Sequence, residues 1–286
     1  PRAPRRGSGR SATGVGGGIQ IFSQKASRPI NLGSGTAVAG INLSGAELDR
    51  IGLDVLPGPI TIGEAGVQTG DITIKLPGTG GPCVGCSGTV IFNQTGSGKI
   101  VLDDGGGIAL SADAVNIILN AGSGGILAAS ATNSFPEIAT TGTVTLNTIG
   151  PIGTTTNRIA FSGINAPSSI IIGQTNAPAS GGVFLDGFGA MNLGAVTTNN
   201  VPLSVVANGA ITANGAIATN GGDIELRSNS DVTVNANVNV PSSAPGTTKR
   251  AMTPNVAMAN PIASKPIQRA FGYRCRNRRH NWPRHR

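Results

Sequence analysis

Short stretches in which apolar and polar residues alternate recur along this chain, each preceded by a glycine or another turn residue. Strict alternation over four or five residues is the period-two pattern of a strand that is buried on one face. Glycine and asparagine between the stretches supply turns that need a positive φ. The clearest examples are Gly18–Ile21, Gly40–Leu43, Gly70–Ile74, Gly142–Leu146, Gly209–Ala213, Gly215–Thr219 and Gly222–Leu226. The sequence therefore predicts many short strands.

Strands this short could build a sandwich, a barrel or a solenoid, and three features favour the solenoid. The long hydrophobic strands that fill a sandwich core are missing, and we expect small residues to dominate the inward positions. Asparagine, threonine and serine recur at strand ends, where they can stack in ladders along an axis. Each unit would bury its face only against its neighbours. We predict an all-β, parallel β-helix of about ten rungs over residues 11–240.

One segment breaks the alternation and predicts a helical turn. Ser44 and Glu47 have the spacing of a capping box, and Leu48 and Ile51 lie on one helical face. We expect this turn to lie between two rungs and to cover a strand edge.

The composition argues against an ordinary globular core. Glycine reaches 44 of 286 residues, while aromatic residues make up 3% and charged residues 12%. Such cores normally bury bulky aromatic side chains, whereas Ile, Val, Leu and Ala suit a pleated surface. Disorder is the rival for a chain rich in small polar residues. The apolar 38% arrives in regular short stretches, which argues against disorder.

The net charge of +8 is unevenly distributed. Residues 1–10 hold four arginines and no acid, and residues 249–286 hold ten basic residues and no acid, which leaves a net −6 between them. We predict three parts: a basic, disordered leader at 1–10, the solenoid at 11–240, and a Pro-rich linker with a basic, disordered tail at 241–286.

The tail has three possible origins. Its arginines with Trp282 could bind nucleic acid, or the tail could be an ordinary solvated basic extension. Its abrupt change to an Arg, Pro, His and Trp composition favours a third explanation, translation out of frame, which could also apply to residues 1–10. We expect no specific nucleic-acid partner.

Several segments together carry a family resemblance. Arg28–Gly33, Ala46–Ile51, Ile60–Gly63 and Gly70–Ile74 resemble the repeat region of filamentous haemagglutinin-like surface proteins, which are giant exported bacterial adhesins. The similarity continues more loosely to Val234. It implies a long right-handed β-helix and export across the inner membrane. In two-partner systems, a dedicated outer-membrane transporter then completes secretion to the cell surface.

The same resemblance leaves other points open. The family's amino-terminal secretion domain is not recognisable here, and the family supplies no catalytic residue to transfer. Glycans or proteins on host or environmental surfaces would be the partners. The chain opens at Pro1 without a start methionine or signal segment, so we expect a repeat-region fragment. No run approaches the ~20 apolar residues of a membrane helix.

Cys83 and Cys86 lie in a loop rich in glycine and proline. A redox motif of this spacing belongs at the start of a helix, but a strand is expected next, at Thr89–Phe92. A zinc site needs four ligands, and the body offers no histidine and no other cysteine. We expect a local disulfide, with free thiols or redox or metal chemistry as alternatives, and we expect no cofactor or metal requirement.

Gly96–Lys99 looks like part of a phosphate-binding loop. Lys99 is followed by Ile100 rather than Ser or Thr, and Asn93 stands where the motif needs its first glycine. In a chain with 44 glycines, we interpret the fragment as a chance match.

The acids decide between two classes of function, because β-helices also host polysaccharide lyases and hydrolases. Such a site needs convergent acids on adjacent rungs of one face. Asp103 and Asp104 are adjacent, so on a strand they would point opposite ways. With Asp186, Asp223 and Asp231, they stand at expected turns. We predict a non-enzymatic stalk of an exported adhesin; the alternative is a polysaccharide-processing enzyme, which a cluster of carboxylates on one face would favour.

Overall fold

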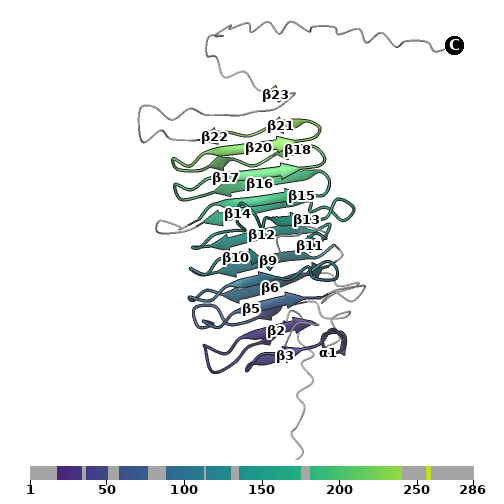
Figure 1. Ribbon diagram of the computed structural model, residues 1–286, viewed down its shortest axis with the longest axis vertical. Coiled ribbons are helices and arrows are strands. Elements are labelled where there is room, and N and C mark those ends of the chain that lie inside the picture. Colours follow the sequence, from purple (N-terminus) through teal and green to yellow (C-terminus); the bar gives the residue numbers. More distant parts are fainter. Residues whose placement is uncertain are drawn as a thin grey trace, which may run out of the picture.

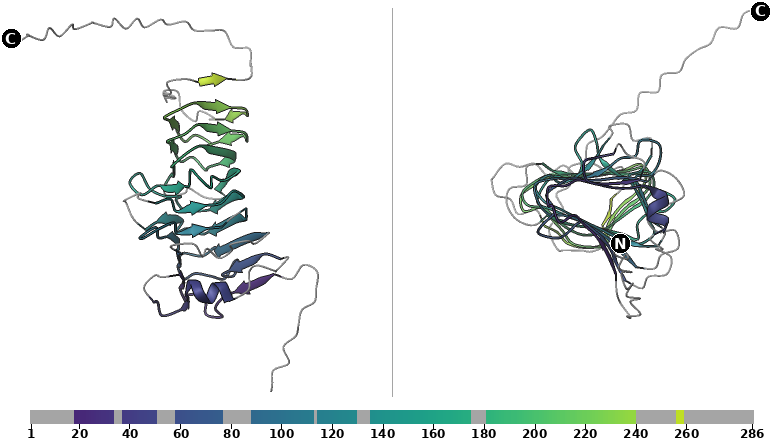
Figure 2. Two further views of the ribbon diagram at one scale, coloured as in Figure 1. Left: turned by 90° about the vertical axis from the view of Figure 1, so that its right-hand side faces the viewer. Right: turned by 90° about the horizontal axis from the view of Figure 1, so that it is seen from below.

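The computed structural model shows a stack of parallel strands wound into a β-helix (Figure 1). Its described residues are 18–33, 37–50, 58–76, 88–112, 114–129, 135–174, 181–239 and 256–258. Within them every strand pairing is parallel, and one short helix interrupts the strands. Seen from below, the strands superpose along the sides of a roughly triangular section (Figure 2). The all-β, parallel β-helix predicted from the alternation is confirmed.

The largest sheet, sheet A, has twelve strands. Ten of them follow one another up the stack: β1 (Ile19–Ile21), β4 (Ile60–Ile62), β6 (Thr89–Gln94), β9 (Asn116–Ala121), β12 (Thr143–Thr148), β14 (Ser169–Gln174), β16 (Met191–Thr197), β18 (Ile211–Ala213), β21 (Val232–Val234) and β23 (Val256–Met258). Two short strands, β19 (Ile217–Ala218) and β22 (Val238–Asn239), continue the upper layers beside β16. At ~4.8 Å per layer, the ten strands span roughly 40 Å.

Two further sheets complete the winding. Sheet B has five strands in spatial order: β10 (Ile126–Ala128), β7 (Ile100–Leu102), β5 (Ile72–Lys75), β2 (Ile30–Gly33) and β3 (Ile41–Leu43). Sheet C has six: β20 (Ile224–Ser228), β17 (Leu203–Ala207), β15 (Val183–Gly187), β13 (Ile159–Phe161), β11 (Ile138–Ala139) and β8 (Leu110–Ser111). Ile152 forms single bridges to Ile126 and Val183, which joins the two sheets.

In-register stacking builds the core. Val90, Ile117 and Val144 pair in successive layers of sheet A, and their side chains are fully buried. Phe92 and Leu119 form a second inward column. We expected small residues at inward positions, but most buried side chains are Ile, Leu and Val, with alanine in the minority. The interior is wide enough for branched side chains from three sheets to meet.

The amino-terminal end is closed by a strand that folds back. β3 pairs with β2 as the last strand of sheet B, so the edge of β2 is covered by β3. The predicted helix follows as α1 (Gly45–Arg50). Its capping box is formed: the Ser44 N–H donates to Glu47 Oε2 (2.9 Å), and Leu48 is buried in the core.

Rung length changes along the stack. Hydrogen-bonded asparagines in neighbouring layers are 27 residues apart at Asn93, Asn120 and Asn147, but 21 apart at Asn208 and Asn229. The longer lower rungs carry loops between their strands, whereas the upper rungs consist mostly of strands and tight turns. Any loop-borne chemistry is therefore concentrated in the lower and middle layers.

Turns use the residues that the sequence predicts. Gly63 has φ 82°, and a Cβ there would lie 2.1 Å from the Asn93 carbonyl oxygen. Asn200 (φ 57°) and Asn220 (φ 51°) supply the same left-handed conformation. At position 63 only glycine fits, because a side chain there would collide with the backbone of the next rung.

One strand extends past the alternating pattern. β23 pairs with β21, with Val232 beside Val256, inside the segment 241–286 that we assigned to linker and tail. Strand pairing therefore continues beyond Val240.

Candidate functional site on the charged side of the solenoid

Among the described strands, charged residues occur only in sheets B and C. The strands of sheet A contain no Asp, Glu, Lys or Arg, as their sequences show. The strands of sheets B and C carry Lys75, Asp186, Glu225 and Arg227, and further charges lie in the loops between them. Any charged chemistry of the strands therefore belongs to sheets B and C.

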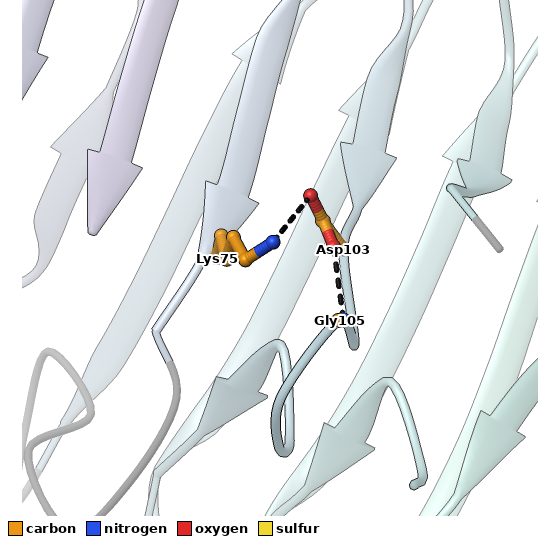
Figure 3. Close-up of polar contacts among 3 residues, drawn as sticks. All are labelled: Lys75, Asp103 and Gly105. Atoms are coloured by element: carbon orange, nitrogen blue, oxygen red, sulfur yellow. Dashed lines mark hydrogen bonds and ion pairs between the residues drawn. The ribbon is translucent and has the colours of Figure 1, made fainter. Parts of the chain in front are cut away.

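Asp103 follows β7 and pairs with Lys75 at the end of β5 (Figure 3). Lys75 Nζ lies 3.2 Å from Asp103 Oδ2, and Asp103 Oδ1 accepts the Gly105 N–H at 2.9 Å. Both side chains are about a quarter exposed. This ion pair fixes a turn, as expected for Asp103, and an exposed pair of this kind contributes about 0–1 kcal/mol.

Two buried acids lie close to this ion pair: Asp104, the residue after Asp103, and Glu137, in the next layer, with exposed fractions of 3% and 0%. Burial, together with the charges of Asp104 and Asp186, raises the pKa of Glu137 to about 8; the Ala160 N–H, which donates to Glu137 Oε2 at 2.6 Å, acts in the opposite direction. Burial also raises the pKa of Asp104, which accepts a hydrogen bond from the Phe135 backbone. These three acids, Asp104, Glu137 and Asp186, are called the acid cluster below.

The acid cluster has two oxygen atoms without hydrogen-bond partners in the structure, Asp104 Oδ1 and Glu137 Oε1. A buried carboxylate without compensation is costly, and protonation removes the charge. At neutral pH Glu137 is therefore a neutral carboxylic acid held against the Ala160 amide.

Arg158 lies across the outer surface of sheet C. Its guanidinium donates to the Leu185 carbonyl (3.1 Å), the Ser204 carbonyl (3.1 Å) and Ser204 Oγ (2.9 Å), and it sits 5.7 Å from the Phe184 ring centre. Ser204 Oγ in turn donates to Glu225 Oε2 at 2.5 Å. The guanidinium donors of Arg158 are thus directed at neighbouring strands, so this side chain joins three layers of sheet C.

Of the other acids that the sequence singled out, Asp223 and Asp231 are exposed beside turns and do not join the acid cluster. Asp186 is half-buried, and its Oδ1 accepts the Gly187 N–H. In the phosphate-loop fragment, the Lys99 N–H donates to Asp71 Oδ1 (3.0 Å) and the Gly96 N–H to the Gln68 carbonyl (3.1 Å). These two backbone N–H groups, which a phosphate would need, are therefore already bonded within the protein, and the acceptor of the Lys99 N–H is the carboxylate of Asp71. Cys83 and Cys86 lie outside the described residues.

Glu137 and Arg158 were missed by the sequence reasoning. Glu137 stands between Pro136 and the strand Ile138–Ala139, without the neighbouring glycine that marks acids such as Asp71 and Asp223 as turn residues. That difference was the available signal for a buried acid. Arg158 gave no comparable signal, because its partners come from rungs 27 and 46 residues away.

The expected ladders are present. Asn120 donates to Asn93 Oδ1 (2.8 Å) and Asn147 to Asn120 Oδ1 (2.9 Å) along the outer face of sheet A. The next layer places Gly173 beside Asn147, which ends the ladder. Buried threonines such as Thr148 bond to turn backbone at the corners. Polar residues of the strands therefore serve mainly to join rungs.

Among the described residues, no group of three or more His, Cys, Asp or Glu is placed to hold a metal ion. No helix in this part of the chain is long and apolar enough to cross a membrane.

The fold places the chain in the class of parallel β-helix proteins. Comparisons with protein-family models, curated proteins and solved structures find no match to it.

Proposed function

We propose that this chain is a passive, extended scaffold, a stalk segment of an exported bacterial surface adhesin. The observation that carries the proposal is the burial of Asp104 and Glu137, two members of the acid cluster; the third, Asp186, is half-buried. Glu137 and Asp104 are almost completely inaccessible, and Arg158 is occupied by backbone carbonyls. A polysaccharide enzyme needs acids that reach the scissile bond. The stacked rungs, by contrast, give a long scaffold whose stability builds layer by layer.

The adhesin assignment rests on the resemblance of Arg28–Gly33 and Ala46–Ile51 to filamentous haemagglutinin-like repeats. It implies secretion through an outer-membrane transporter and a location at the cell surface. The test is expression in the native host, followed by protease treatment of intact cells. Degradation of the chain on intact cells is expected; protection until lysis would contradict the location.

Adhesion by such a scaffold would be weak per copy and strong in many copies. Beads coated at increasing density with the full chain should therefore attach to host or environmental surfaces with a steep dependence on density. Attachment by single copies that is as strong as attachment by dense coatings would contradict this mode of action.

The alternative, a polysaccharide-processing enzyme, keeps one observation in its favour. Asp104 and Asp186 both interact electrostatically with Glu137, and Asp186 also interacts electrostatically with Arg158. The full chain should be incubated with pectic, alginate-type and other acidic polysaccharides. We expect no turnover. Turnover that disappears in Asp186→Asn or Asp104→Asn, with the fold retained, would replace the scaffold proposal by the enzyme.

A further inference from the structure

The outer face of sheet A is an uncharged surface. Its central column runs through Thr61, Ile91, Ile118, Thr145 and Ile171, which pair in register in successive layers. All five side chains are half-buried, so they remain accessible on the outside of the sheet. This column is called the aliphatic stripe below.

Polar columns flank the aliphatic stripe on both sides. One side carries the ladder Asn93–Asn120–Asn147, and the other carries Thr89 beside Asn116. The ladder amides already bond to one another along the axis. Covering them with another protein surface would leave fewer unpaired polar groups than covering free amides.

We propose that this face is where two copies of the chain pack side by side, sheet A against sheet A. The face carries no charge on any described strand, and Glu64 and Asp231 lie at its edges, beside β4 and β21, so two copies can pack without burying an ion in the centre of the interface. The charges of sheets B and C stay in water on the other sides. Flat sheets pack about 10 Å apart with interleaved side chains, which the aliphatic stripe can provide.

The area of the face comes close to what a stable pair needs. Ten layers at ~4.8 Å give a height of roughly 40 Å, and about five strand residues per layer on average, six or seven in the middle layers from β6 to β16, give a mean width of about 16 Å. The resulting ~650 Å² per copy lies near the ~800 Å² that one partner contributes to a standard interface. The proposal concerns how scaffolds associate and stands independently of the adhesive function proposed above.

The test is sedimentation equilibrium of the full chain over a range of concentrations. We expect a reversible dimer whose dissociation constant changes little between about 0.05 M and 0.5 M salt, because no ion pair holds it. Ile118→Arg places a charge at the centre of the stripe and should weaken the dimer at least about tenfold. Thr145→Arg, in the next layer, should act in the same direction.

Val101→Arg is the matched control, because Val101 is a half-buried outward residue on β7 in sheet B. It should leave the dimer intact, and thermal melting should show that all three variants fold. A monomer at every concentration would overturn the proposal, as would a dimer indifferent to Ile118→Arg or one that dissociates in salt. Retention of a monomeric wild-type chain on a neutral polysaccharide, lost in Ile118→Arg, would assign the face to a glycan instead.

Discussion

Sheet A and the opposite side of the β-helix are made by the same winding, yet their chemistry differs. The strands of sheet A lie directly above one another without a charged residue, and their amides form ladders. The side formed by sheets B and C carries the ion pair between Lys75 and Asp103, the Arg158 side chain that joins three layers, and the acid cluster. In-register stacking places equivalent positions of successive rungs directly above one another, so charged residues of the same sign at such positions would repel each other. The strands of sheet A avoid this repulsion because they contain no charged residue. On the side of sheets B and C, charged groups are paired, as at Lys75 and Asp103, or buried, as at Glu137.

The largest expected effect separates inward from outward residues on one strand of sheet A. Leu119 is fully buried, whereas its neighbour Ile118 points outward and is half-buried. Leu119→Ala should lower the free energy of unfolding by about 2–5 kcal/mol, because it leaves a cavity in the core. Ile118→Ala should lower it by less than half as much. Chemical denaturation measures both, and equal losses would show that the register is wrong.

The next effect concerns the charged side and depends on pH. The pKa of Glu137 is raised from 4.5 to about 8, so the unfolded chain releases this proton before the folded one does. Stability should therefore fall as the pH rises from about 4.5 to about 8 and level off above that. Glu137→Gln should flatten most of this slope and stabilise the protein at pH 8 by a few kcal/mol.

Asp231→Asn serves as the control for that experiment, because Asp231 is an exposed acid beside a turn. It should leave the pH slope unchanged. A Glu137→Gln variant that keeps the wild-type slope would mean that Glu137 is ionised in the folded chain at neutral pH.

A smaller effect tests the ladder on sheet A. Asn120 donates to Asn93 and accepts from Asn147, so Asn120→Ala removes two hydrogen bonds and leaves two amides without this partner. We expect a loss of about 1–3 kcal/mol in unfolding free energy. Thr61→Ala on the same face, at a residue that lies beside Ile91 and outside the asparagine ladder, should change stability by less than about 0.5 kcal/mol. If both variants lose a similar unfolding free energy, the asparagine ladder does not stabilise the protein more than any other outward position of sheet A.

The smallest effect is expected at the ion pair between Lys75 and Asp103. Both side chains are partly exposed, so Lys75→Ala should change stability by at most about 1 kcal/mol, and high salt should shrink the difference. Thermal melting at two salt concentrations measures it. A large effect that salt does not alter would mean that the pair is sheltered from water.

The strands were predictable because their pattern is local. Gly142–Leu146 alternates in the sequence and becomes β12 with alternating burial, and Ser44 with Glu47 marks the start of α1. The acid cluster was not predictable, because its members are brought together by register between rungs. Glu137 lies against Ala160, 23 residues away, and no local pattern reports that distance. The fold-back of β3 on β2 and the branched core were missed for the same reason: both depend on how the rungs stack.

The central claim, that parallel in-register stacking sorts the residues of each strand between core and surface, can be tested by paired cysteines. In a background without the native cysteines, Ile118→Cys with Thr145→Cys places two outward thiols on adjacent strands in register. Parallel strands lie ~4.8 Å apart, within reach of a disulfide or a short cross-linker. The shifted pair, Leu119→Cys with Thr145→Cys, puts the thiols on opposite faces. We predict efficient cross-linking of the first pair and almost none of the second; the reverse order, or equal yields, would contradict the account.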